Sequence, residues 1–216
     1  NYSTAYNDSL GIEKLQKYAS LFGLNERTGI EIEEAAPQIA NEFPVMAAIG
    51  QSNNNYTTVQ LARYVTAVAN EGTVYQYTLL NRLEDSDGNV LQTFEPQVRN
   101  QIDVLDTEEW NAIHSGMRMV VENTKEFDGF PIEAAGKTGT AQQNLKRPNH
   151  ALFVGYAPYD DPEISIATRI AYGYTSHNAA KLARNVFAYY FNVENEDELL
   201  NGQAANGNSS SNEISD

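Results

Sequence analysis

The apolar positions of the chain change between helical and extended spacing, and turn residues mark most of these changes. Apolar side chains recur every three or four residues over four segments: 10–24, 57–70, 107–123 and 178–191. This period is typical of amphipathic helices. The second helix should be capped by Thr57 or Thr58, and the third should begin at Thr107. The predicted buried positions are Leu10, Ile12, Leu15, Tyr18, Ala19 and Phe22; Leu61, Ala62, Val65, Val68 and Ala69; Ile113, Met117, Val120 and Val121; and Leu182, Val186, Tyr189 and Tyr190.

The extended segments predict antiparallel pairing. Residues 75–96 indicate a β-hairpin that turns at Ser86-Asp87-Gly88. Residues 132–142, 150–158 and 164–173 are rich in small and β-branched side chains, which is typical of strands. Helices interspersed with such strands predict an α+β fold, in which helices flank an antiparallel sheet.

The chain divides by composition near residue 192. Residues 1–191 carry all the periodic segments, whereas residues 192–216 are acidic and rich in Asn, Ser and Gly. We therefore expect one domain over 1–191, followed by a disordered tail over 192–216.

Charge and cysteine content exclude several classes of protein. The formal net charge is −15, which argues against nucleic acid as a partner and against a polybasic membrane-surface domain. The absence of cysteine excludes disulfides, thiolate metal sites and a cysteine nucleophile. No apolar run approaches the ~18 residues of a membrane span.

The stretch EAAGKTGTAQQ resembles two different functional motifs. A phosphate-binding loop needs a glycine five positions before the Gly-Lys-Thr glycine, but that position holds Pro131. The stretch also leads into a loop and another strand rather than into a helix. Both the spacing and the context therefore argue against phosphate binding.

The second possibility is one strand of an acyl-transfer site. A lysine, Lys137, would supply positive charge, and Gly139 would leave room for an acyl group beside the strand. The hydroxyls of Thr138 and Thr140 could bind a carboxylate, and the backbone N–H after the glycine could stabilise an oxyanion. By itself the tetrapeptide is weak evidence, because an exposed strand end with a solvated lysine would read the same.

Further segments strengthen this interpretation. Four segments together resemble the transpeptidase domain of class B, high-molecular-weight penicillin-binding proteins. They are YASLFGLNERTGIEI, IGQSNNNYTTVQLARYVTAVANEGT, MRMVV, and AAGKTGTAQ followed by HALFVGYAPYDDPEISIA. Two positions depart from the family pattern: Ser52 replaces a glycine and Thr58 replaces a proline. Gly50 and Gln51, in the Gly-Gln segment, could line the site or form a structural turn.

The resemblance implies a penicillin-binding protein/serine β-lactamase-like fold. The intact domain would have a five-stranded sheet, with its first two strands N-terminal to this chain. It implies D,D-transpeptidation of peptidoglycan stem peptides, with β-lactams trapping the same serine and no cofactor or metal. Lys137 would act near the nucleophile, Thr138, Gly139 and Thr140 would bind substrate, and the Thr140 N–H would form half of the oxyanion hole. The protein would work on the extracytoplasmic face of the bacterial cell membrane, anchored through a segment N-terminal to this chain.

Two motifs of this family are missing from their expected places. No Ser-x-x-Lys occurs, and the Ser-x-Asn matches at Ser52-Asn53-Asn54 and Ser210-Ser211-Asn212 lie in the wrong order or in the tail. We expect the chain to begin after both motifs, to lack the nucleophilic serine and to be inactive alone. A D,D-carboxypeptidase, a β-lactamase, a β-lactam sensor or a non-catalytic binding module of the same fold remain alternatives.

Other polar residues carry weaker indications. His114, His150 and His177 lack metal-ligand spacing, although His150 begins a strand beside the motif and could have a positional role. Arg147, in the loop after the motif, is either a solvated charge or a residue that shapes substrate access. Without its family partner strand, residues 164–172 would form an open sheet edge, which predicts self-association of the fragment.

Overall fold

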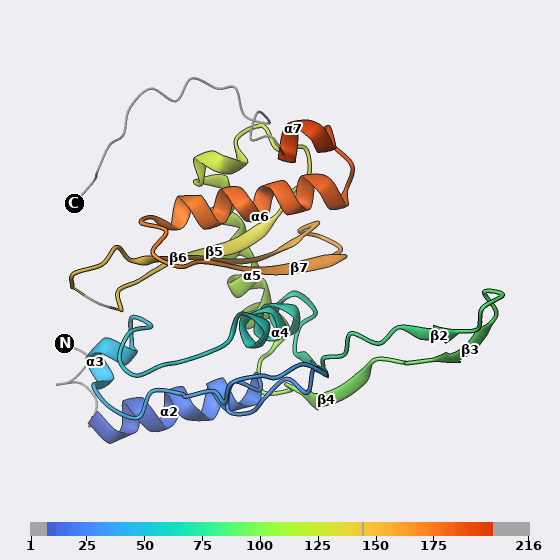
Figure 1. Cartoon of the computed structure of the whole chain (residues 1–216). Helices are drawn as coiled ribbons and strands as arrows, with labels where there is room; N and C mark the ends of the chain where they lie inside the picture. Colours follow the sequence, from blue (N-terminus) through green and yellow to red (C-terminus); the bar gives the residue numbers. More distant parts are fainter. Residues whose placement is uncertain (1–7, 144, 201–216) are drawn as a thin grey trace.

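A three-stranded antiparallel sheet forms the centre of the molecule. The computed structural model describes residues 8–143 and 145–200. The sheet has the order β5-β6-β7, made of β5 (Ala135–Ala141), β6 (His150–Ala157) and β7 (Ile164–Ile170) (Figure 1). Its registers run without a bulge from Ala135↔Tyr156 to Ala141↔His150 and from Ala151↔Ile170 to Ala157↔Ile164. The three strands predicted from sequence are therefore confirmed, and so is the α+β class.

Helices cover both faces of this sheet. Helix α6 (Ser176–Tyr190) lies on one face, while α4 (Thr58–Ala69) and α5 (Thr107–Glu122) lie on the other (Figure 1). The central strand serves both layers, because Phe153 packs with the α6 side and Tyr156 packs with α4. Both aromatic side chains have no exposed surface. Alternation of side chains along one strand thus builds two separate cores.

The predicted buried face of α6 is wrong. Leu182, Val186, Tyr189 and Tyr190 are 37–60% exposed. The face that packs on the sheet consists instead of Ala179, Ala180, Ala183, Phe187 and Ala188. Small alanine side chains let the helix approach the sheet closely, and the larger apolar residues are left on the outer surface.

The buried face of α5 is also rotated from the predicted one. Ile113 is 36% exposed, whereas Trp110 is 4% exposed and packs against α4 and β1 (Thr73–Gln76). Val121 is buried as expected, and Met117 and Val120 are half-buried. A wide aromatic ring at residue 110 takes the place near the core that the pattern assigned to Ile113.

Both long helices on this face begin with a capping box. Thr57 accepts a hydrogen bond from the Gln60 N–H, and the Gln60 side chain bonds back to Thr57, which confirms one of the two predicted caps of α4. Helix α5 begins at Thr107, as predicted, and its cap is Asp106, paired with Glu109 in the same way. Each box satisfies two N–H groups that the helix leaves without partners.

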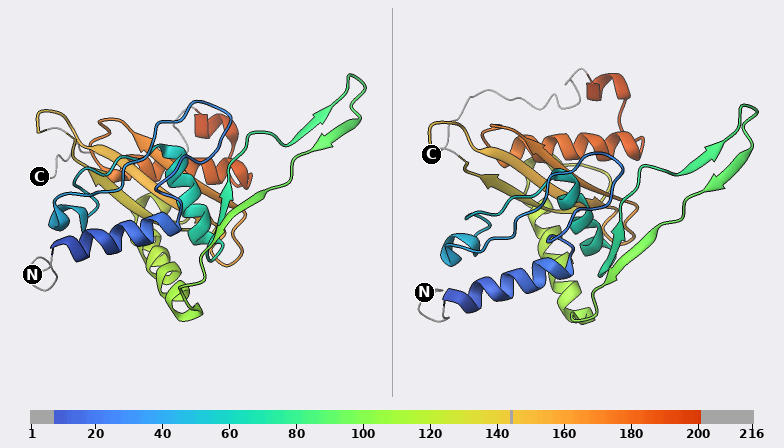
Figure 2. Two further views of the ribbon diagram at one scale, coloured as in Figure 1. Left: turned by 90° about the horizontal axis from the view of Figure 1, so that it is seen from below. Right: turned by 60° about the horizontal axis from the view of Figure 1, so that its bottom comes forward.

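A long β-hairpin projects from the body. β1 pairs with β4 (Gln97–Gln101) near the body, and β2 (Arg82–Glu84) pairs with β3 (Val90–Thr93) further out (Figures 1 and 2). Its tip turns at Gly88, which has a φ of 83°. Asp85 accepts hydrogen bonds from the backbone N–H groups of Asp87 and Asn89. The predicted hairpin and its turn are confirmed.

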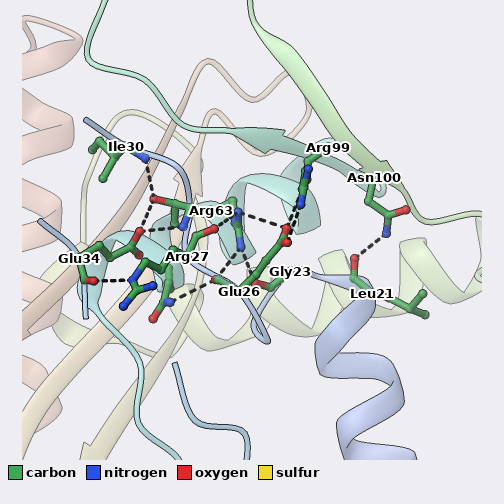
Figure 3. Close-up of polar contacts among 11 residues, drawn as sticks. Leu21, Gly23, Glu26, Arg27, Ile30, Glu34, Arg63, Arg99 and Asn100 are labelled. Atoms are coloured by element: carbon green, nitrogen blue, oxygen red, sulfur yellow. Dashed lines mark hydrogen bonds and ion pairs between the residues drawn. The ribbon is translucent and has the colours of Figure 1, made fainter. Parts of the chain in front are cut away.

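Arg63 ties the N-terminal segment to the body. Helix α2 (Asp8–Leu21) is followed by Gly23, where φ is 74° and a Cβ would collide with the Arg63 guanidinium. Arg63, 2% exposed, donates to the carbonyls of Gly23, Glu26 and Arg27 (Figure 3). The Glu26 carboxylate bonds to Arg99 of β4 at 3.0 and 2.9 Å, which lowers the pKa of Glu26. One buried arginine therefore links α2, α4 and, through Glu26, the hairpin.

Three short helices complete the described residues. They are α3 (Pro44–Ala47), the 3-10 helix η1 (Lys125–Phe127) and α7 (Glu196–Leu200). Helix α7 falls within the predicted tail, and Arg184 of α6 forms a two-pronged ion pair with Glu194 just before it. Residues 201–216 of that tail lie outside the described residues. None of the described helices is both long and apolar enough to cross a lipid bilayer.

Candidate active site

The Lys-Thr-Gly-Thr stretch lies on an open edge of the sheet. Lys137, Thr138, Gly139 and Thr140 occupy the middle of β5, which pairs with β6 and with no other strand among the described residues. The side chains of Lys137 and Thr140 are exposed, and Thr138 and Gly139 are half-buried. An extended ligand could therefore approach the strand from its unpaired side.

Side-chain alternation divides the motif between the two faces. Lys137 and Gly139 pair with Val154 and Leu152, on the face that α4 and α5 cover. Thr138 and Thr140 lie on the opposite face, which carries Phe153 and α6. The lysine and the two hydroxyls therefore flank the same strand edge from opposite sides.

Backbone groups of alternate residues also face this edge. The Lys137 ammonium donates to the Thr138 carbonyl at 2.8 Å, and Arg118 of α5 donates to the Ala134 carbonyl at 3.2 Å. The even-numbered residues of this segment thus direct their carbonyls away from β6. Because N–H and C=O of one strand residue point the same way, the Thr140 N–H lies at the open edge as well.

The two glycines of the motif strand differ in what surrounds them. A Cβ on Gly136 would lie 2.8 Å from the Val154 carbonyl oxygen and closer still to the Phe153 ring. A Cβ on Gly139 would make only an ordinary contact, 3.4 Å from the Leu152 Cβ. Packing within the described chain therefore requires Gly136 but leaves the space beside Gly139 unfilled.

His150 organises the end of the sheet next to the motif. Its side chain is 6% exposed, and its Nδ1 accepts from the Tyr172 N–H at 3.1 Å. Nε2 must then carry the proton, which it donates to the Gln143 side chain at 2.8 Å. Burial and the nearby Arg169 charge lower the pKa of His150. The ring therefore joins the segment after β5 to the segment after β7.

The other histidines lie elsewhere. His114 bonds to the Val68 carbonyl at 2.7 Å, and His177 bonds to Glu126 at 2.8 Å. Within residues 8–143 and 145–200, no three side chains of metal-binding type form a cluster.

The two Ser-x-Asn strings take no part in a described site. The Ser52 hydroxyl donates to the Glu42 carbonyl at 2.5 Å, in a turn after α3, and Ser210-Ser211-Asn212 lies outside the described residues. In that turn Gly50 has a φ of 78°, and the Gln51 N–H bonds to the Met46 carbonyl at 3.0 Å. These contacts favour the structural interpretation of the Gly-Gln segment.

Sequence reasoning missed part of the sheet end. Tyr172, Arg169 and Gln143 meet around His150, although they lie 7–22 residues from it in sequence. Arg169 could have been found from its position in the predicted strand β7. There it pairs with Leu152 of β6, which in turn pairs with Gly139, so Arg169 and Gly139 lie on the same face of the sheet.

The open edge of β5, in an antiparallel sheet flanked by helices, agrees with the penicillin-recognising class of domain that the motifs resemble. The family described as "Penicillin binding protein transpeptidase domain" matches residues 2–188. The chain belongs to this family, and the resemblance inferred from its motifs is confirmed.

Known relatives agree with this assignment. Peptidoglycan D,D-transpeptidase MrdA of Haemophilus influenzae is 33% identical, in an alignment that covers 88% of this chain and 34% of the relative. Penicillin-binding protein 2A of Bacillus subtilis is 26% identical, in an alignment that covers 92% of this chain and 31% of the relative. The chain therefore spans about a third of the length of these relatives.

Solved structures share the fold. Penicillin-binding protein 2B of Streptococcus pneumoniae superposes with a TM-score of 0.74 at 25% identity, over 85% of this chain and 33% of that one. Penicillin-binding protein A of Mycobacterium tuberculosis does so with a TM-score of 0.73 at 22% identity, over 83% of this chain and 42% of that one.

Proposed function

We propose that this chain supplies the lysine strand of a serine D,D-transpeptidase that cross-links peptidoglycan. The observation that carries the proposal is the placement of Lys137, Thr138, Gly139 and Thr140 on the open edge of β5. The name of the Haemophilus influenzae relative supports the reaction, because that protein is a peptidoglycan D,D-transpeptidase.

In the proposed reaction, a serine supplied from outside residues 1–216 attacks the carbonyl carbon of the penultimate D-Ala of a stem peptide. The bond to the terminal D-Ala nitrogen breaks, and that amine leaves with a proton. An amine of a neighbouring stem then attacks the acyl-serine ester and releases the serine. β-Lactams acylate the same serine. The reaction needs no cofactor.

Each motif residue takes one role in this scheme. The Lys137 ammonium provides positive charge and a hydrogen bond near the serine oxygen. The Thr138 and Thr140 hydroxyls bind the carboxylate of the terminal D-Ala, which leaves as the amine. The Thr140 N–H, directed to the open edge, donates to the developing oxyanion, and Gly139 leaves room for the acyl group.

A further part of the proposal concerns the longer protein. Its transpeptidase domain works on the extracytoplasmic face of the bacterial membrane, and its anchor lies outside residues 1–216.

The 216-residue chain alone is inactive, because no Ser-x-x-Lys occurs in it. Incubation of this chain with a fluorescent penicillin should leave no labelled band at its mass on a denaturing gel, and a labelled band would contradict the assignment of the serine.

The role of Lys137 is tested by Lys137→Ala in the full-length protein. We expect acylation by a fluorescent penicillin to slow at least ~10²-fold, the low end for loss of one catalytic polar group. Lys125→Ala, which removes the same charge from an exposed site on η1, is the matched control and should keep the wild-type rate. If folded Lys137→Ala were acylated at the wild-type rate, Lys137 would be only a solvated lysine on an exposed strand.

A further inference from the structure

The outer half of the hairpin, residues 77–96, stands clear of the body as a two-stranded ribbon (Figures 1 and 2). Within the part of the chain that the structure describes, β2 and β3 pair only with each other, and every residue of both strands is exposed. A two-stranded ribbon that no third strand or helix covers is marginally stable in water. Packing within the described chain therefore does not account for the large apolar side chains that this ribbon carries.

Hydrogen bonds hold the ribbon in a defined shape at both ends. At its tip, one Asp85 carboxylate oxygen accepts from the Asp87 and Asn89 N–H groups, each at 2.9 Å, and the other oxygen accepts from the Asn89 side chain. At its base, the Glu31 carboxylate accepts from the Leu79 N–H at 2.7 Å. An element that is ordered before it meets a partner loses little conformational freedom on binding.

Apolar side chains lie along the outside of this ribbon. Five of them are 43–68% exposed: Leu79, Leu80, Leu83, Val90 and Leu91. Leu91 is the most exposed of the five. The register passes from Leu83↔Gln92 to Glu84↔Val90, so Leu91 is the extra residue of a β-bulge. Bulges redirect side chains and are frequent beside functional sites, and contiguous exposed apolar side chains mark interaction surfaces.

Carboxylates border these apolar residues. Residues 77–96 contain four acidic side chains, Glu84, Asp85, Asp87 and Glu95, and one basic side chain, Arg82, which pairs with Glu84. An apolar centre with a polar rim is the usual composition of a protein–protein interface. The negative rim is complementary to a surface on which Lys or Arg surrounds apolar side chains.

The same charges argue against two other occupants. An anionic lipid surface attracts Lys and Arg and would repel four carboxylates. The ribbon of a second copy carries the same negative rim, and like charges brought together at an interface are strongly unfavourable. The ribbon contributes about 20 residues, which is enough for one side of a stable interface between two different proteins.

We propose that this ribbon is a docking surface for another protein, whose contact surface carries apolar side chains bordered by Lys and Arg. Leu91 and its apolar neighbours form the centre of the contact, and the carboxylates form its rim. The ribbon projects away from the sheet that carries Lys137 (Figure 1). A protein bound there leaves the open edge of β5 accessible, so docking and acylation are separable.

The test places a photo-cross-linking amino acid at Leu91 of the full-length protein, in cells that produce it. Leu182, which is 45% exposed on α6, is the matched control position. Leu91 should give one dominant adduct with a different polypeptide, and the control position should not give this adduct. Mass spectrometry of the cross-linked peptide should identify a contacted segment with apolar residues and more Lys and Arg than Asp and Glu.

Charge reversal then tests the rim. The pair Asp87→Lys and Glu95→Lys should lower the yield of the Leu91 adduct at least roughly fivefold, because attraction at two positions becomes repulsion. The pair Asp160→Lys and Asp161→Lys makes the same change of net charge in the exposed turn between β6 and β7, and should keep the yield. Acylation by a penicillin should be unchanged in both variants, which shows that each is folded.

Several outcomes would overturn the docking surface. They are the absence of an adduct at Leu91, and an adduct with lipid, with a second copy or with another part of the same polypeptide. A contacted segment without an excess of basic residues would do so too, as would a yield that does not respond to charge reversal at the rim. Failure of the wild-type protein to react with a penicillin would instead contradict the proposed function.

Discussion

Replacing each glycine of β5 by alanine should separate packing from function. On Gly136 the new methyl group would press on the buried Phe153 ring and the Val154 carbonyl. Overpacking of this kind costs about 1–3 kcal/mol. Reduced freedom of the unfolded chain offsets about 0.5–1 kcal/mol. We therefore expect Gly136→Ala to lower the free energy of unfolding by about 1–2 kcal/mol.

Gly139→Ala should behave differently. Its methyl group would make only an ordinary contact with Leu152, so the stability should stay level or rise by about 0.5 kcal/mol. The same methyl group would stand on the face of β5 that Lys137 occupies, where the acyl group is proposed to approach. Acylation of the full-length protein by a penicillin should therefore slow at least tenfold, although the fold is intact.

Urea unfolding of the 216-residue chain, followed by the fluorescence of Trp110, measures the stabilities. This single tryptophan is 4% exposed and so reports on unfolding. With an m-value of about 2 kcal/mol/M, the expected loss in Gly136→Ala lowers the midpoint by roughly 0.5–1 M. Equal destabilisation by both substitutions, or normal acylation of Gly139→Ala, would refute the reasoning.

Three further predictions concern stability and association. Arg63→Met should lower the free energy of unfolding by about 3 kcal/mol, because it leaves the backbone carbonyls of Gly23, Glu26 and Arg27 without their donor. Arg99→Gln, at the exposed end of the network, should cost far less, and equal losses in urea titrations would contradict this. Burial and the Arg169 charge lower the pKa of His150, so the unfolded chain binds its proton first, and stability should fall as the pH drops from about 6.5 toward the folded pKa. His150→Gln should remove that part of the pH dependence, and an unchanged pH profile would rule out this cause. Because β7 pairs with β6 alone among the described residues, the chain should self-associate through residues 164–172 at moderate salt, and light scattering that shows a monomer at every salt concentration would count against an open edge.

The strands and the motif were predictable from sequence because their signals are local. A run such as HALFVGYAP is bounded by turn residues, and one strand contains the whole Lys137–Thr140 motif. The hairpin tip was predictable for the same reason, since Gly88 supplies the left-handed conformation that the turn needs. The family assignment followed from four such local segments in a fixed order.

The packing of α6 was not predictable in this way. The pattern of large apolar residues predicted that Leu182 and Val186 face the core. The sheet packs instead against the alanine face of the helix, because small side chains let the two elements come close together. The contacts around His150 depend on β5, β6 and β7 coming together, and the sequence next to Tyr172 gives no indication of them. Tertiary contacts decide both features.

The most direct test of the central claim locates the acylated residue. The full-length protein is treated with a penicillin, digested, and the modified peptide is identified by mass spectrometry. The adduct should lie on the serine of a Ser-x-x-Lys sequence outside residues 1–216, and Lys137→Ala should strongly reduce its yield at short times. An adduct on any serine within residues 1–216, or a yield that does not depend on Lys137, would contradict the assignment of this chain as the lysine strand of the site.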